Sequence, residues 1–446
     1  MKELLAKYDV PVPRYTSYPT VPAWDQNLET AQWVEHVRHS LKNEDASWSM
    51  YFHVPFCESL CTFCGCNNII TKNHKLEDPY VDHLLKEWSL YLEAVPDLSK
   101  RRLRHLHLGG GTPTFLSEAN LEKLFSLMFK NIVRDDRWEA SIEVDPRRTR
   151  KEQLAVLRKF GFNRISLGVQ DFDHEVQRLV NRIQPFEITK GISDEARALG
   201  FESVNFDLIY GLAKQTPESM KKTAELTIAL KPDRIALYSF ALVPWIKPAQ
   251  RLFKDEDLPK AEEKRKLYEI AREAFLKAGY VEIGMDHFAL PTDGLAQAMK
   301  NGGLHRNFMG YTDQRTELLL ALGVSGISET PESFHQNEKV LPKYEQLLGE
   351  GKIPTLKGHV HTEMDRKRWA QILKFVTAFE VELEKDQIGD ADRFLSEMLK
   401  DGLVVRDGSF LKMTEKGKPF LRNACAFFDE RLREMKPHSQ IFSKSI

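Results

Sequence analysis

The chain has 446 residues, more than one compact domain usually contains, so we expect one large domain with an appendage or two domains. Its 64 Lys and Arg residues balance 65 Asp and Glu residues, which gives no reason to expect a nucleic acid or an acidic membrane surface as the main partner. Residues 1–17 lack the apolar core of a signal peptide, and no later stretch approaches about eighteen uninterrupted apolar residues. We therefore expect a cytoplasmic protein without a membrane span.

Short β-rich runs alternate with amphipathic helical runs through most of the chain. The first strand is predicted at 49–55 and its helix at 78–95. Further strand and helix units follow in this order: 104–110 with 117–132, 139–146 with 150–161, 164–172 with 175–182 and 188–200, 203–212 with 217–230, and 234–242 with 261–279. Such units in series predict an α/β protein with a parallel sheet and outer helices, either a complete or partial barrel or a doubly wound sheet.

Residues able to do chemistry lie at the ends of these strands, where α/β proteins place their sites. A cysteine-rich loop follows the first strand, and GGGTPT (109–114) follows the second, before a helix that Ser117 is expected to cap. The later strands contribute residues at or near their ends: Glu143, Asp145, Gln170, Asp207 and Ala241. Alone, the glycines indicate only a turn and the carboxylates only caps or salt bridges. Their common position predicts one shared site.

The segment FCESLCTFCGC (56–66) holds four of the five cysteines. In a reducing compartment such a cluster indicates metal ligands or redox centres rather than disulfides. Structural zinc usually takes two paired ligand sets a dozen or more residues apart, and here only the distant Cys425 remains. Cys57, Cys61 and Cys64, spaced CxxxCxxC, instead suit three irons of a 4Fe-4S cluster and leave the fourth iron open to a small molecule.

These motifs resemble the radical S-adenosylmethionine (SAM) superfamily, whose signature is CxxxCxxC after a first strand. The resemblance extends over nearly the whole chain in these segments: RYTSYPT (14–20), CGCNNII (64–70), SIEVDP (141–146), RISLGVQDF (164–172), FDLIYGL (206–212), PWIKPAQR (244–251), GMDHFA (284–289) and LHRNFMGYT (304–312). Together they are similar to the oxygen-independent coproporphyrinogen III dehydrogenases, a family of haem-pathway enzymes that work without oxygen.

The resemblance implies a partial (β/α)6 radical SAM barrel and so selects one of the architectures left open above. We expect an N-terminal strap or lid over 1–45, the catalytic barrel over 46–330, and a mostly helical C-terminal domain over 331–446. Within the last region, 365–379 is a predicted amphipathic helix. The segment 401–428 is predicted as a hairpin followed by a helix, like a small winged-helix element.

The resemblance also implies site residues. Cys57, Cys61 and Cys64 match the cluster ligands, and Cys66 matches a family cysteine that does not bind the cluster. Contacts to the SAM on the open iron are matched by Tyr51, Gly110, Glu143 and Ile327. Contacts to a second SAM are matched by Phe63, Gly111, Thr112, Gln170, Arg182, Asp207 and Ala241.

The implied reaction is the oxidative decarboxylation of two propionates of coproporphyrinogen III to vinyl groups, giving protoporphyrinogen IX in anaerobic porphyrin and haem biosynthesis. It needs an electron donor and an electron acceptor, which the sequence does not identify, and a monomer is expected to suffice. The substrate carboxylates need cations, because the chain is nearly neutral. Arg14, Lys247, Arg251 and Arg306 lie in the family-specific segments and are the candidates.

Several alternatives stay open. Tyr15 and Tyr18 precede the barrel, as a lid over its mouth or as a strap packed on the surface. His53 and His305 are candidates for proton movement, but an isolated histidine is more often structural, so neither is named as catalytic. A haem-trafficking relative and a tetrapyrrole-modifying radical SAM methyltransferase are alternative functions, and a structural zinc protein is a more distant one. RYTSYPT, PWIKPAQR and LHRNFMGYT resemble the dehydrogenases rather than the trafficking branch.

Overall fold

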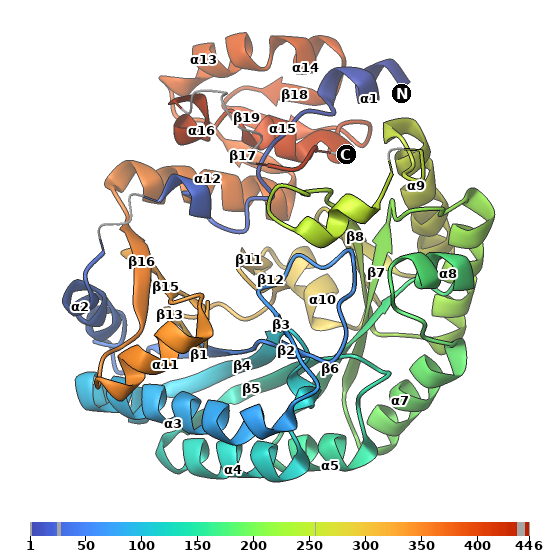
Figure 1. Cartoon of the computed structure of the whole chain (residues 1–446). Coiled ribbons are helices and arrows are strands. Elements are labelled where there is room, and N and C mark those ends of the chain that lie inside the picture. The colour runs from blue at the N-terminus through green and yellow to red at the C-terminus, as the bar shows by residue number, and fades with distance from the viewer. Residues whose placement is uncertain (1, 25–27, 255, 435–441, 446) are drawn as a thin grey trace.

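The computed structural model describes residues 2–24, 28–254, 256–434 and 442–445. A curved wall of parallel strands runs through its centre (Figure 1). In the described part of the chain six of these strands each lead to an outer helix: β1 (Ser47–Val54), β4 (Arg102–Gly110), β5 (Val133–Val144), β6 (Arg164–Gln170), β7 (Ser203–Tyr210) and β8 (Arg234–Ser239). The predicted partial (β/α)6 barrel is confirmed.

The helices that cover the outer face follow the strands in order. They are α3 (Glu77–Ala94), α4 (Glu118–Met128), α5 (Lys151–Lys159), the short α6 (His174–Leu179), α7 (Phe186–Ala198), α8 (Pro217–Leu230) and α9 (Ala261–Lys277). Ser117 caps α4, since its side chain accepts from the Asn120 N–H, as the sequence predicted. Ala241 lies two residues beyond the end of β8, so the predicted strand 234–242 is too long at this end.

Side chains alternate along the parallel strands between two different environments. Met50 and Phe52 of β1 and Phe206 of β7 are fully buried in the core between sheet and helices. The residues between them, such as Tyr51 and Asp207, point to the opposite, inner face. The inside of the barrel is therefore a cavity whose wall includes many polar residues, and the apolar core lies outside it.

The sheet continues beyond the barrel strands at both edges. On one side β13 (Leu318–Leu322) pairs parallel with β1, and β14 (Ile327–Glu329), β15 (Ser333–Asn337) and β16 (Thr355–Val360) add antiparallel strands. On the other side β10 (His287–Ala289) and β9 (Val281–Ile283) extend β8. The boundary expected at residue 330 therefore falls inside a continuous sheet, because β15 and β16 belong to it.

The segment from β9 to β13 closes the amino ends of the barrel strands. It carries α10 (Gly294–Lys300), β11 (His305–Asn307) and β12 (Gly310–Thr312). Asp293 Oδ1 accepts a hydrogen bond from Arg234 Nε at 2.7 Å, and Asp293 Oδ2 forms a 3.4 Å ion pair with Nη1 of Arg164, whose Nε contacts Glu139 Oε2 at 2.6 Å. Breaking such buried pairs is costly, since each leaves an uncompensated charge, so they hold this segment in place.

The C-terminal part has its own core. This core begins after α11 (Leu341–Gly349), which packs on α3 and buries Tyr344 and Leu348 in the barrel core. The elements that follow are α12 (Glu363–Ala378), β17 (Glu380–Glu382), α13 (Gln387–Phe394), α14 (Ser396–Lys400), β18 (Val404–Asp407), β19 (Phe410–Met413), α15 (Leu421–Cys425) and α16 (Glu430–Glu434). The predicted helix 365–379 and the hairpin followed by a helix in 401–428 are confirmed. None of the described helices is long and apolar enough to cross a membrane.

The N-terminal segment belongs to this second core. It forms α1 (Lys2–Tyr8), and a short bridge pairs Pro11 with Lys444 near the other end of the chain (Figure 1). Tyr15 and Tyr18 are only 1% and 2% exposed among C-terminal residues, and Tyr15 donates to Asp429 Oδ2 at 3.1 Å. The two side chains are therefore buried and not on the surface, whereas the expected strap or lid over 1–45 stays a prediction. The next helix, α2 (Thr30–Ser40), contacts β15.

Replacing Tyr15 by Ala tests this assignment. Loss of a buried aromatic side chain is expected to lower the free energy of unfolding by about 3–5 kcal/mol. Val10→Ala, at a side chain that is 42% exposed, is the control and is expected to change it by less than about 0.5 kcal/mol. Urea denaturation followed by circular dichroism measures both. Equal stability of the two variants would contradict the placement of Tyr15.

Candidate functional site

A cavity of about 520 Å³ lies inside the barrel and reaches from strand starts such as Arg164 and Arg234 to the cysteine loop at the carboxyl ends of the strands. It is lined by the cysteine loop, by the glycine run after β4 and by the strands from β4 to β8. It brings together most of the residues that the sequence singled out: Cys57, Cys61, Phe63, Cys64, Cys66, Gly110, Gly111, Thr112, Glu143, Gln170, Arg182, Asp207 and Ala241. Residues from distant parts of the sequence thus face one space, as the strand-end argument predicted.

Tyr51 and Ile327 do not line this cavity. Tyr51 stacks on His107, a lining residue, with ring centroids 5.8 Å apart. The Asn67 carbonyl can only accept, so His53 Nε2 donates to it at 2.8 Å and His53 Nδ1 accepts from the Tyr51 hydroxyl at 3.1 Å. Burial lowers the pKa of His53, which is therefore a neutral link between β1 and the cysteine loop. Ile327 begins β14, which only β13 separates from β1.

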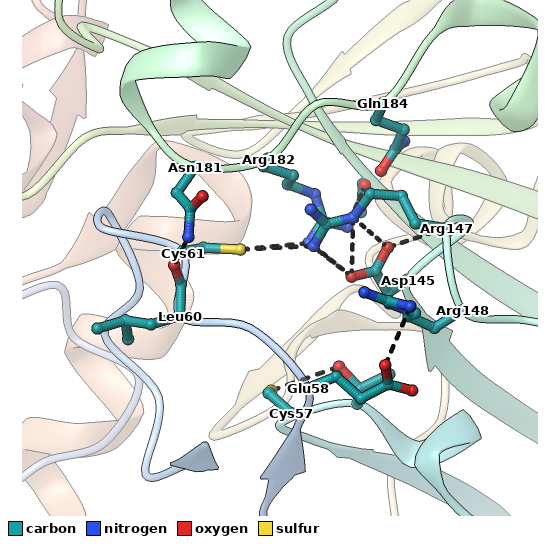
Figure 2. Close-up of polar contacts among 12 residues, drawn as sticks. Cys57, Glu58, Leu60, Cys61, Asp145, Arg147, Arg148, Asn181, Arg182 and Gln184 are labelled. Atoms are coloured by element: carbon teal, nitrogen blue, oxygen red, sulfur yellow. Dashed lines mark hydrogen bonds and ion pairs between the residues drawn. The ribbon is translucent and has the colours of Figure 1, made fainter. Parts of the chain in front are cut away.

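The cysteine loop is closed at its base and anchored at two further points. β2 (Phe56–Cys57) pairs with β3 (Ile69–Ile70), so the loop leaves and returns at one place. Glu58 forms a 3.0 Å ion pair with Arg148, and Asn181 Nδ2 donates to the Leu60 carbonyl at 2.7 Å (Figure 2). The loop is thereby fixed to the segments that follow β5 and β6.

Two arginines reach the sulfur of Cys61. Arg182 Nη1 lies 3.6 Å and Arg147 Nη2 3.7 Å from this Sγ, and both guanidinium groups also contact Asp145 (Figure 2). Burial opposes ionisation of Asp145, but the charge of Arg182 and the hydrogen bonds from Arg147 prevail and hold its pKa below the usual value. Arg182 Nη2 also donates to the Gly168 carbonyl at 2.7 Å, and this bond fixes the position of the guanidinium group.

The other two predicted ligands have contrasting environments. Cys57 Sγ lies 3.4 Å from Thr112 Oγ1, and burial raises the pKa of Cys57 to about 11. A hydrogen bond from Cys66 and the charge of Lys247 outweigh burial at Cys64 and lower its pKa to about 6. Among the described residues no group of three or more His, Cys, Asp or Glu side chains is gathered closely enough to hold a metal ion. Three thiols from one loop facing one cavity nevertheless match the donor chemistry of an iron-sulfur cluster.

The glycine run approaches the first strand too closely for any side chain. A Cβ on Gly111 would lie 2.6 Å from the Pro55 carbonyl oxygen, and the Gly111 N–H donates to the Val54 carbonyl at 2.7 Å. Gly110 has a φ of +117°, which side chains rarely adopt. Glycine is therefore required here by the packing of β4 against the base of the cysteine loop.

Glu143 lies beside this glycine run at the end of β5. His107 Nε2 is 3.2 Å from its Oε1, and the Gly110 N–H donates to its Oε2 at 3.3 Å. Burial opposes ionisation, but the hydrogen bond and charge of His107 prevail and lower the pKa of Glu143. The site thus presents a carboxylate to the cavity.

Asp207 lies deeper on the inner face, in β7. The Ser166 hydroxyl donates to its Oδ2 at 2.7 Å and Asn205 Nδ2 donates to its Oδ1 at 2.9 Å. Burial raises its pKa to about 6, although the bond from Ser166 works in the opposite direction. Gln170 ends β6 with a φ of +67°, so its backbone leaves the strand in a conformation that is unusual for a side chain of this kind.

The four candidate substrate cations have different positions. Arg14 lines the cavity and donates to the Ser239 carbonyl at 2.8 Å. Lys247 donates to the carbonyl of Cys66 at 2.6 Å, so its side chain contacts the cysteine loop. Arg251 donates to the Pro244 carbonyl, and it does not line the cavity. Arg306 is 4% exposed, lies behind the cavity wall and is discussed below.

Some contributors to the site were missed from the sequence. His107, Asn205 and Ser166 hold the predicted carboxylates, and Arg147 reaches Cys61. Asn205 and Ser166 share strand parity with Asp207 and Gln170, and His107 alternates with the apolar Leu106 and Leu108, so these patterns could have identified them. His305 does not line the cavity, and burial, aided by the charge of Arg315, lowers its pKa to about 4.

Known proteins resemble this chain in sequence and in fold. The Radical SAM superfamily model matches residues 51–227. The chain is 40% identical to the oxygen-independent coproporphyrinogen III oxidase of Salmonella typhimurium, over 99% of this chain and 98% of the relative, and 36% identical to that of Helicobacter pylori, over 100% and 99%. The chain belongs to the oxygen-independent coproporphyrinogen III oxidase family.

A solved structure supports the family assignment. The Escherichia coli coproporphyrinogen III oxidase, described as a radical SAM enzyme, superposes with a TM-score of 0.88 at 39% identity, over 94% of this chain and 97% of that one. The radical SAM barrel of this coproporphyrinogen III oxidase family member is therefore shown by sequence and by fold together.

The glycine packing generates one prediction. Gly111→Ala is expected to lower the free energy of unfolding by about 1–3 kcal/mol, because the new methyl group meets backbone that cannot turn away. Gly191→Ala on the exposed face of α7, where a Cβ meets nothing within 4 Å, is the matched control. It is expected to raise stability by about 1 kcal/mol, because alanine favours the helix. Urea denaturation measures both variants. A free energy of unfolding of Gly111→Ala equal to that of the unaltered protein would refute the close approach of Gly111 to the backbone of Pro55.

Asp207 generates a prediction about pH. Its folded-state pKa of about 6 lies above the unfolded value of about 3.9. The folded protein therefore holds the extra proton between these pH values and loses stability as the pH rises through them. Asp207→Asn removes this loss, so its stability relative to the unaltered protein is expected to increase by about 2–3 kcal/mol between about pH 4 and pH 7. Denaturation experiments at several pH values measure the free energies of unfolding of both proteins. If the difference between Asp207→Asn and the unaltered protein did not change with pH, the raised pKa of the buried Asp207 carboxyl group would be contradicted.

Proposed function

We propose that this chain catalyses the oxygen-independent oxidative decarboxylation of two propionates of coproporphyrinogen III, which become the vinyl groups of protoporphyrinogen IX. The observation that carries this proposal is the similarity at 36–40% identity to curated relatives of that name over almost the full length of both chains. The cavity supports it, since the thiols, glycines and carboxylates of the superfamily face one space. The chain would thus serve anaerobic porphyrin and haem biosynthesis.

Cys57, Cys61 and Cys64 would hold the 4Fe-4S cluster, because they are the thiols of one closed loop facing the cavity. The bound cluster and SAM supply a one-electron cleavage that yields a carbon radical able to abstract hydrogen. Arg147 and Arg182 direct N–H groups at Cys61, so they would stabilise negative charge on its sulfur.

Charged side chains around the cavity suit the zwitterionic SAM. For the SAM on the cluster, the proposed contacts are Tyr51, Gly110, Glu143 and Ile327. The Glu143 carboxylate, held ionised by His107, offers an acceptor for a cationic group. For a second SAM, the proposed contacts are Phe63, Gly111, Thr112, Gln170, Arg182, Asp207 and Ala241. Arg182 and Asp207 provide groups of opposite charge for a carboxylate and an ammonium.

Selectivity must come from position, because a carbon radical abstracts hydrogen from almost any neighbouring C–H bond. The chain's contribution is to hold one propionate within reach and to exclude water. The ion pair of Arg148 with Glu58 in the cysteine loop and that of Arg164 with Glu139 between β6 and β5 support this role, since they join neighbouring parts of the cavity wall. We further propose that the chain acts as a monomer in the cytoplasm with an external electron donor and acceptor.

The test is anaerobic turnover of the reconstituted protein with reductant, SAM, coproporphyrinogen III and a cell extract that supplies the acceptor. Release of two carbon dioxide molecules for each macrocycle is expected, and Cys61→Ser is expected to abolish it together with the cluster absorbance. Cys425→Ala, at the free cysteine in the C-terminal core, is the control and is expected to keep both. SAM cleavage without decarboxylation, or tight haem binding without product, would overturn the proposal.

A further inference from the structure

A second, smaller cavity adjoins the first. Its volume is about 70 Å³, and it lies where the N-terminal segment, the carboxyl ends of β7 and β8, α9 and the C-terminal part meet (Figure 1). We call it the basic pocket, after its charged lining residues: Arg14, Arg265, Arg306, Lys418, Arg422 and Asp286. Five cations thus surround it, and among the described lining residues Asp286 is the one acid.

Arginine N–H groups in this pocket lack acceptors. Arg306 is 4% exposed, and in the described part of the chain its Nε and Nη1 have no hydrogen-bond partner. The Nη1 atom is 3.9 Å from Asp286 Oδ1, beyond hydrogen-bond length, and the guanidinium lies over the ring of Tyr311. Arg265 Nε is likewise buried without a partner among the described residues. Buried donors of this kind are costly unless an acceptor satisfies them.

Acids outside the lining offset only part of the positive charge. Arg265 pairs with Glu269, and Lys418 pairs with Glu415 at 2.6 Å. For the remaining cations, Arg14, Arg306 and Arg422, Asp286 is the one negatively charged side chain among the described lining residues.

The electrostatic environment reflects this excess. Burial, followed by the charge of Arg14, lowers the pKa of Arg422 to about 9. Burial opposes ionisation of Asp286, yet the charges of His287 and Arg306 lower its pKa to about 2. The pocket is therefore a place of positive potential in which a further negative group is stabilised.

The basic pocket and the large cavity share part of their walls. Arg14 and Ser239 line both, and Arg14 Nη2 donates to the Ser239 carbonyl at 2.8 Å. The ring of Tyr311 lines the large cavity, and the guanidinium of Arg306 stacks on it at 4.4 Å. A molecule that fills the large cavity therefore lies next to the basic pocket, with Arg14 and Ser239 between the two spaces.

We propose that the basic pocket binds one carboxylate of the tetrapyrrole, on a propionate arm other than the one that reacts, with Arg306, Arg265 and Arg14 as donors. The space has room for a few water-sized groups, which accommodates a carboxylate but no pyrrole ring. This inference rests on the proposed function, because the macrocycle is its substrate. Anchoring one arm would orient the ring and so decide which propionate faces the radical.

The test measures binding separately from turnover. Coproporphyrin III, the fluorescent oxidised form of the macrocycle, is titrated into the reconstituted holoenzyme and into its variants Arg306→Gln and Arg265→Gln. Each variant is expected to raise the Kd about tenfold or more, since a hydrogen bond to a charged group is worth at least that factor. Arg102→Gln, at an exposed arginine paired with Asp136, is the matched control and is expected to leave the Kd unchanged.

The methyl ester of the same porphyrin identifies the group that is recognised. The ester is expected to bind the unaltered enzyme and Arg306→Gln with equal Kd, because it has no carboxylate to lose. A Kd for the free acid that is unchanged in folded pocket variants would overturn the proposal. Thermal unfolding shows whether each variant is folded, and Arg265→Gln decides the question if Arg306→Gln does not fold.

Inorganic phosphate distinguishes the substrate from a free oxyanion. Phosphate that competes with coproporphyrin III in the unaltered enzyme and not in Arg306→Gln supports the proposal. Phosphate that stabilises the enzyme through Arg306 but leaves the porphyrin Kd unchanged overturns it and assigns the pocket to a free anion. Absence of carbon dioxide release would refute the proposed function whatever the Kd values, whereas unchanged Kd values in an active enzyme refute the pocket alone.

Discussion

The division of each parallel strand into an apolar outer face and a polar inner face is the constraint on which the rest of this structure depends. In β7, Phe206 and Leu208 are buried against the helices, whereas Asn205 and Asp207 face the cavity. The outer face supplies the hydrophobic free energy that stabilises the barrel. The inner face does not have to form a hydrophobic core, so it can carry charged and hydrogen-bonding groups around an open space.

The site is assembled on this frame by close backbone contacts. The tight approach of Gly111 to Pro55 joins the glycine run after β4 to the base of the cysteine loop. Arg182 then connects that loop to the ends of β5 and β6 through Asp145 and the Gly168 carbonyl. Glu143 and Asp207 are likewise held from a neighbouring strand, by His107 of β4 and by Ser166 of β6.

The N-terminal segment packs against the C-terminal part and contributes to the rim of the large cavity. The N-terminal segment packs Tyr15 and Tyr18 into the C-terminal core, and in doing so it delivers Arg14 to the rim of the large cavity. Arg422 holds this segment by donating to the Pro13 carbonyl at 2.9 Å. The C-terminal part thus acts on the cavity through the N-terminal segment, and the basic pocket lies at their junction.

The sequence by itself determined the local features of this protein. Strand and helix alternation predicted a parallel sheet with outer helices, and the family resemblance selected the partial barrel. The spacing of Cys57, Cys61 and Cys64 predicted the cluster chemistry, because such spacing is a short-range pattern. Strand parity would also have found His107. The partners of Tyr15, the unpaired donors of Arg306 and the extent of the sheet to β16 were decided only by the tertiary structure. Each depends on residues hundreds of positions apart or on strands added at an edge, and no local pattern encodes which distant surfaces will meet.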